Sequence, residues 1–185
     1  MNNVKCEIKK LVIPTYPEPA AEEMPMFAEN RVHQRTSGRP YPNKVVLRVD
    51  RENKIGKEYT VVVLGNEYLK IEILPEIGGR IYSALDKTTG YDFFYKQHVI
   101  KPALIGVLGS WISGGVEFNW PFHHRASGFM PCDFVTETLP DGTAVCHLSE
   151  RDPIDRMKGM VSIVLRPGEK RFETRMRLYN RTDTA

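Results

Sequence analysis

Two hairpin patterns after residue 132 constrain the fold more than any other feature of the sequence. In the first, the runs DFVTETL and AVCHLSE flank a turn over Pro140–Thr143, where Asp-Gly supplies a glycine that accepts positive φ without a Cβ clash. In the second, MVSIVL and RFETRMRLYN flank Arg166–Lys170, and Phe172, Met176 and Leu178 lie among charged neighbours. Strands joined by turns this short pair in an antiparallel sheet.

The same period of two predicts strands before residue 133. The runs KVVLRVD from Lys44, EYTVVVLGN and YLKIEIL predict three strands, and in the last of these Leu, Ile and Ile alternate with Lys and Glu as in a half-buried strand. Pro75–Gly79 breaks the pattern, RIYSALD restarts it, and the turn residues of Asp86–Gly90 lead to an aromatic strand, YDFFY. No helix-period segment of useful length and no internal repeat occurs. We therefore predict an all-β protein built as an antiparallel β-sandwich.

The chain before residue 44 has a different character. Val4–Tyr16 alternates imperfectly between apolar and polar residues, which predicts an opening strand that Pro14 and Pro17 end. Residues 18–43 hold further prolines and no periodicity, which predicts a long irregular connection on the surface. We divide the chain into residues 1–43, a strand with this connection, and residues 44–185, part of a β-sandwich. The chain finishes on RMRLYNRTDTA without a following partner strand, so we expect an incomplete domain.

Composition excludes several classes of protein. A hydrophobic share of 41% and a charged share of 26% are typical of a packed globular chain. The net charge of +3 has no basic run behind it, so we predict no nucleic-acid binding. Neither a signal-peptide core nor a run long enough to span a bilayer occurs, so we expect no membrane association and a cytoplasmic location. Three cysteines without a CxxC pair indicate free thiols in a reducing compartment.

The densest chemistry lies in Trp111–Asp133, written WISGGVEFNWPFHHRASGFMPCD. Aromatic faces beside fork-shaped hydrogen-bonding groups suit a polar ring with apolar faces and a hydroxylated rim, and a sugar fits that description. Either tryptophan could instead pack in the core, and the polar residues could instead form an ion-paired cluster that holds the loop. We predict a saccharide ligand bound by Trp111, Glu117, Asn119, Trp120 and Arg125.

His123 and His124 are adjacent, so on an extended backbone they point to opposite sides and one of them faces a given pocket. With an unperturbed pKa of about 6.5, the histidine that faces the site could act as an acid or base near a ring oxygen. The histidine spacing matches no compact zinc pattern, and neither Gly78–Gly79 nor Gly114–Gly115 is a nucleotide-binding loop. We therefore predict no metal and no cofactor.

The stretch from Leu69 to Lys96 resembles the early strands of the galactose mutarotase-like supersandwich superfamily. The segment SWISGGVEFNWPFHHRASGFMPCDF is similar, more narrowly, to an uncharacterised bacterial group in which a domain of unknown function precedes tetratricopeptide repeats. The resemblance implies that this chain is the N-terminal part of a larger supersandwich domain and that Arg80 reaches a ligand hydroxyl, although an arginine on the solvent face of a strand is the commoner arrangement. The residues that carry the superfamily pattern are Pro75, Gly78, Gly79, Arg80, Asp86, Thr89 and Gly90.

Three functions follow as expectations. The first is a carbohydrate-binding domain, the substrate-recognition part of a sugar-active protein. The second is an aldose epimerase or another carbohydrate-active enzyme that uses His123 or His124. In the true aldose epimerases a late carboxylate handles protons at the anomeric centre, and here it would fall beyond Ala185. The third is a structural or interaction domain that serves helical repeats.

Overall fold

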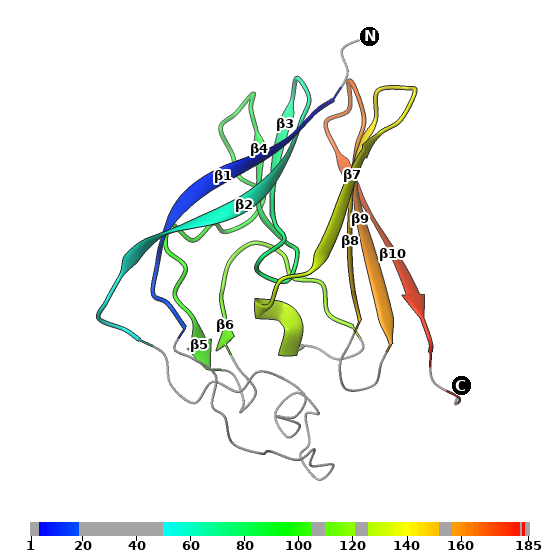
Figure 1. Ribbon diagram of the computed structural model, residues 1–185. Coiled ribbons are helices and arrows are strands. Elements are labelled where there is room, and N and C mark those ends of the chain that lie inside the picture. The colour runs from blue at the N-terminus through cyan, green and yellow to red at the C-terminus, as the bar shows by residue number, and fades with distance from the viewer. Residues whose placement is uncertain are drawn as a thin grey trace.

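The fold is described from a computed structural model, which covers residues 4–18, 50–104, 110–120, 126–151, 157–181 and 183. It is all-β, as predicted, and Figure 1 shows its two four-stranded antiparallel sheets. In the described part of the chain, no helix has the length and apolar character needed to cross a membrane. The first sheet contains β1 (Lys5–Thr15), β2 (Ile55–Gly65), β3 (Leu69–Leu74) and β4 (Arg80–Asp86). The second contains β7 (Asp133–Thr138), β8 (Ala144–Arg151), β9 (Lys158–Leu165) and β10 (Phe172–Tyr179). Between the two sheets in sequence lie a short two-stranded pair and one 3-10 turn: β5 (Ala103–Leu104) with β6 (Ser110–Trp111), and η1 (Ala126–Phe129).

Each four-stranded sheet is a meander in which sequential strands are neighbours, in the orders β1-β2-β3-β4 and β10-β9-β8-β7. The predicted turns make these connections. Gly142 has φ +84°, and its N–H donates to the Leu139 carbonyl at 2.9 Å. At the end of β4, the Gly90 N–H donates to the Asp86 carbonyl at 2.9 Å. Both predicted hairpins of the second sheet are confirmed.

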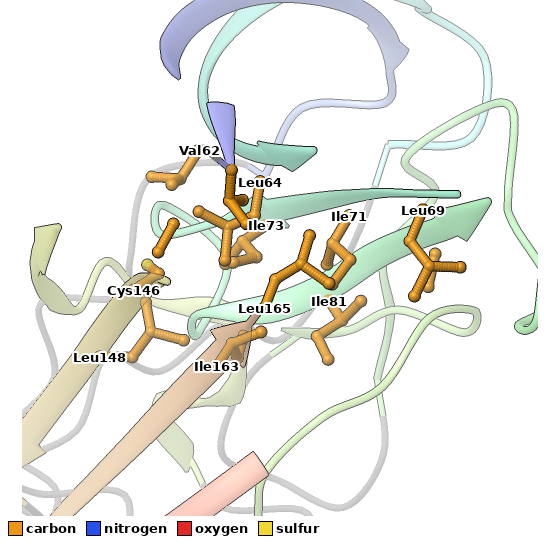
Figure 2. Close-up of a cluster of buried hydrophobic side chains, with 13 residues drawn as sticks. Val62, Leu64, Leu69, Ile71, Ile73, Ile81, Cys146, Leu148, Ile163 and Leu165 are labelled. Carbon is orange, nitrogen blue, oxygen red and sulfur yellow. The ribbon is translucent and has the colours of Figure 1, made fainter. Parts of the chain in front are cut away.

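The main core lies between the two sheets. Residues that face each other across antiparallel strands project from the same side, so the register of β8 with β9 sets Cys146 beside Ile163 on the inner face. Figure 2 shows apolar side chains of both sheets gathered in this layer. Its buried members include Val62, Leu64, Ile71, Ile73, Ile81, Ala144, Cys146, Leu148, Ile163 and Leu165.

A second core covers the opposite face of the first sheet. It is built from Tyr59 and Val61 on β2, Tyr82 on β4, and Ile100 and Ile112 from the segment that follows β4. β3 and β4 are therefore buried on both faces of the sheet. The prediction of a half-buried β3 is wrong for this reason, since Glu72 is only 8% exposed.

Two local predictions fail for identifiable reasons. Pro14 does not end the first strand, because β1 is an edge strand, where a proline without an N–H is tolerated. The Pro14 carbonyl accepts the Ile100 N–H at 2.8 Å. YDFFY is not a strand, since it makes a single bridge, between Leu85 and Asp92. The Asp92 carboxylate accepts the N–H groups of Ala84 at 3.0 Å and Phe94 at 3.2 Å, so a side chain replaces part of the backbone hydrogen bonding that a strand would make. The predicted strand KVVLRVD and most of the predicted connection lie outside the described residues.

One side chain ties the two sheets together. The Asn66 amide nitrogen donates to the carbonyls of Arg166, at 2.8 Å, and Glu169, at 2.7 Å, in the β9–β10 turn. Its amide oxygen accepts the N–H groups of Tyr68, at 2.9 Å, and Leu69, at 2.8 Å, in its own turn. All four hydrogen-bonding groups of a buried residue are used, so the β2–β3 and β9–β10 turns are held at a fixed distance.

The inner face of β10 is incompletely covered. Phe172, at the start of this strand, packs against the main core. Met176 and Leu178 share its face but remain 45% and 42% exposed. This strand therefore presents apolar side chains to solvent on the side where a sandwich normally has its core.

The three cysteines are free thiols, as predicted. Cys146 is buried in the main core, while Cys6 and Cys132 are half-buried. Burial raises the pKa of the Cys146 thiol to about 12. Cys146 is therefore protonated at neutral pH and behaves as a core residue.

Candidate functional site

The predicted site segment is fixed to the edge of β4. The N–H of Ile81 donates to the Val116 carbonyl at 3.1 Å, and the N–H of Val116 donates back to Ile81 at 2.9 Å. Gly115 makes this approach possible, because it has φ +67° and a Cβ built on it would lie 2.1 Å from the Ile81 oxygen. The glycine pair of the motif therefore serves a close approach between two backbones.

Three of the predicted site residues meet at the carboxylate of a fourth, Glu117. Glu117 accepts a hydrogen bond from the Trp111 indole nitrogen at 3.1 Å and another from the Asn119 amide at 3.0 Å. The Arg80 guanidinium lies 3.6 Å from the same carboxylate. We call Arg80, Trp111, Glu117 and Asn119 the Glu117 cluster. Glu117 and Asn119 therefore lie on the same side of the segment.

Arg80 is not on a solvent face. It is 2% exposed, and its guanidinium donates to the carbonyls of Ile112, at 3.2 Å, and Gly114, at 2.5 Å. The preference for an exposed arginine fails because the segment around residue 113 covers this end of β4. Arg80 therefore connects the strand, the covering segment and the Glu117 carboxylate.

Trp120 lies apart from the Glu117 cluster. It lines a narrow, mostly apolar pocket of about 30 Å³ with Phe118 and with residues of the second sheet, among them Met176. A Cβ on Gly159 would stand 3.5 Å from the Trp120 ring. The Trp120 indole nitrogen is buried and has no hydrogen-bond partner among the described residues.

The remaining predicted residues, His123, His124 and Arg125, lie outside the described residues, so their roles stay predictions. Within the described ranges, no three His, Cys, Asp or Glu side chains are grouped so that they could hold a metal ion.

Sequence reasoning missed a charged cluster beside the site segment. Glu72 of β3 contacts Lys70 at 2.5 Å and Lys96 at 2.8 Å. Burial raises the pKa of the Glu72 carboxyl, but the hydrogen bonds from the two lysines outweigh it and the net pKa is lowered. Lys96 also stands over the Tyr82 ring, 4.7 Å from its centroid. The only sequence signal was the Lys-x-Glu alternation of β3, which is also the pattern of a solvated strand face.

This cluster predicts an acid-sensitive contribution to stability. Glu72→Gln removes the partner of both lysines and should lower the free energy of unfolding at neutral pH by about 1 to 2 kcal/mol. Because the folded-state pKa is lowered, the wild-type advantage is present above the unfolded-state pKa of about 4.3 and is lost as the pH falls through the folded-state value.

Urea denaturation of the wild type and Glu72→Gln at neutral and acidic pH tests this contribution. The exposed Glu58→Gln serves as the control and should follow the wild type at both pH values. A difference between wild type and Glu72→Gln that is independent of pH would contradict the assignment.

Two comparisons with known proteins bear on this architecture. A family model described as "Domain of unknown function (DUF5107)" matches residues 40–185. The crystal structure of a TPR-domain containing protein from Parabacteroides distasonis ATCC 8503 superposes with a TM-score of 0.80 at 23% sequence identity. The match covers 96% of this chain and 29% of that protein. At this identity the likeness establishes the fold alone, and the chain spans less than a third of the length of that relative.

Proposed function

Because the chain belongs to the DUF5107 family, whose description assigns no function, we propose from the site itself that it is a carbohydrate-binding β-sandwich domain. The Glu117 cluster is the proposed contact with the saccharide. The domain would then act as the recognition part of a larger sugar-active protein.

The observation that carries this proposal is the fixed position of the Glu117 carboxylate. Donors on Arg80, Trp111 and Asn119 orient it from different directions, while its side chain remains 20% exposed. A carboxylate held in this way accepts hydrogen bonds from ligand hydroxyls without losing side-chain entropy on binding. The half-buried Trp111 ring adds an aromatic surface beside it. A hydroxylated ring with an apolar face matches both groups.

We further propose that residues 44–185 are the N-terminal portion of a galactose mutarotase-like supersandwich, with residues 1–43 as its leading strand and connection. The exposed inner face of β10 supports a larger sandwich, since Met176 and Leu178 would be covered by further strands. The free thiols of Cys6, Cys132 and Cys146 support a reducing, cytoplasmic setting.

A glycan array followed by calorimetry on the full chain tests saccharide binding. Glu117→Gln keeps the shape of the side chain but removes its charge, and it should weaken binding of any saccharide found on the array by about a hundredfold. Trp111→Phe keeps an aromatic ring without the N–H and should weaken binding by about tenfold. The exposed Glu58→Gln should bind as the wild type does.

Thermal unfolding of each variant, recorded alongside, separates loss of binding from loss of fold. If the unaltered chain binds no saccharide on the array or in the calorimeter, the proposed function is wrong.

A second candidate is an interaction domain that serves tetratricopeptide repeats. The exposed apolar face of β10 favours it, and the solved relative is described as a TPR-domain containing protein. Under this candidate the repeats contact Met176 and Leu178, and Glu117→Gln leaves that interaction unchanged. The same variants therefore distinguish the two functions.

A further inference from the structure

Three aromatic side chains stand in solvent on the segment that follows β4. Tyr91, Phe93 and Tyr95 are 64%, 41% and 72% exposed, whereas the intervening Asp92 and Phe94 are partly buried. The backbone bends at Phe93 and Phe94, and the three exposed residues border one hollow of the surface. We call Tyr91, Phe93 and Tyr95 the aromatic strip. Grouped exposed aromatic residues are unusual on a protein surface and mark binding sites.

The backbone beneath the strip is held in place. The Tyr91 carbonyl accepts the Asp86 N–H at 2.8 Å, and the Phe93 N–H donates to the Ala84 carbonyl at 2.9 Å. Phe94 packs edge-on against Phe172 with 6.4 Å between ring centroids. The strip is thus an ordered extension of the sheet edge, and a ligand that stacks on it pays little of the entropy of fixing a loop.

The backbone of the strip is joined to the segment that carries Glu117. The Tyr95 carbonyl accepts the N–H of Gly115 at 2.8 Å, and Gly115 is two residues before Glu117. A Cβ on Gly114 would lie 3.0 Å from the same carbonyl. The strip is therefore a neighbour of the site segment along the edge of β4.

The surface of the strip suits a neutral ligand that is both apolar and hydroxylated. Its rings border a shallow, open hollow of about 570 Å³, which Lys96 and His98 complete. The Lys96 charge is balanced by Glu72 at 2.8 Å. Tyr91 and Phe93 meet edge to face with centroids 6.2 Å apart, so successive rings present differently tilted surfaces along a line. Linked sugar units with a turn between them match this arrangement better than one flat ring does.

We infer that the aromatic strip binds the outer units of an oligosaccharide whose end unit lies at the Glu117 cluster. The ligand class is then a neutral sugar chain, and a free monosaccharide fills only part of the site. This inference rests on the proposed function, because it takes the Glu117 cluster as the anchor for the end unit.

Calorimetry on the full chain with glucose, galactose and xylose, and with malto-, cello-, xylo- and galacto-oligosaccharides of increasing length, tests the inference. Affinity should rise with chain length by about tenfold or more before it levels off. The double variant Tyr91→Ala/Tyr95→Ala should lower the oligosaccharide affinity to that of the monosaccharide, about tenfold, and leave the monosaccharide affinity unchanged. Tyr179→Ala, an exposed tyrosine on β10, is the matched control and should bind oligosaccharides as the wild type does.

The other outcomes are separable. If affinity is independent of chain length, or if the strip variant binds oligosaccharides as tightly as the wild type, the inference is overturned while Glu117-dependent sugar binding still supports the proposed function. If no probe binds at all, both are wrong. If the strip variant changes self-association in size-exclusion chromatography and not sugar affinity, the strip is a protein contact and the inference is overturned.

Discussion

Gly115→Ala should destabilise the protein by about 3 to 5 kcal/mol, a loss at the upper end of what single substitutions cause. The new Cβ would lie 2.1 Å from the Ile81 carbonyl oxygen, and φ at this residue is +67°. The backbone must move apart, which breaks the paired hydrogen bonds between Ile81 and Val116. Glu117 follows directly in the chain, so the same movement should displace the candidate site.

Gly90→Ala is the matched control for this substitution. Gly90 also has positive φ, +75°, but nothing lies within 4 Å of its Cβ position. Gly90→Ala should lower the free energy of unfolding by only about 1 to 2 kcal/mol, the strain of an alanine in the left-handed region. Urea denaturation with equal m-values measures both costs. Equal losses at Gly115 and Gly90 would show that the close approach to Ile81 contributes nothing.

Arg80→Met should lower the free energy of unfolding by about 3 to 5 kcal/mol, since it removes one partner of a buried ion pair. The carbonyls of Ile112 and Gly114 lose their guanidinium donor, and the Glu117 carboxylate loses its nearby positive charge. Chemical denaturation measures the loss, and thermal unfolding should show a correspondingly lower Tm.

Two further variants isolate the source of this cost. Arg175→Met removes an exposed arginine that pairs with Glu173 on β10, and it should leave stability nearly unchanged. Arg80→Met combined with Glu117→Gln should lose less than the sum of the two single changes, because the second change removes the uncompensated charge. Strict additivity would contradict the coupling between Arg80 and Glu117.

The strands were predictable wherever one physical signal dominated. Alternation with Asp-Gly or Pro-Gly turns specifies β7 to β10, since both side-chain burial and turn geometry favour the same pairing. Prediction failed where another element supplied the missing partner. Pro14 stays inside β1 because an edge strand needs no N–H there, and Glu72 is 8% exposed with Lys96, from the segment after β4, paired to it at 2.8 Å.

The candidate site was predictable in its residues and only partly in its geometry. The alternation of Glu117 with Asn119 on one extended segment places both on one side, which local sequence alone can indicate. That Arg80 would meet them from β4 depends on a contact between residues far apart in the chain. Trp120 points to the second sheet because Gly159 leaves room for its ring, and that glycine is remote in sequence. The aromatic strip was predicted as a strand, since its alternation matches a strand pattern equally well.

The position of Asn66 has a mechanical consequence for the pocket at Trp120. Its four hydrogen bonds join the two sheets at the end of β9 that leads into the β9–β10 turn, whereas Gly159 and the Trp120 ring lie at the opposite end of the same strand. Beside Trp120 the sheets are fastened by backbone groups instead, since the Gly78 N–H donates to the Met130 carbonyl at 2.7 Å and the Cys132 N–H donates to the Pro75 carbonyl at 3.0 Å. The sandwich is therefore fastened at both ends of β9, and the space around the Trp120 ring can widen only if one of these sets of hydrogen bonds breaks.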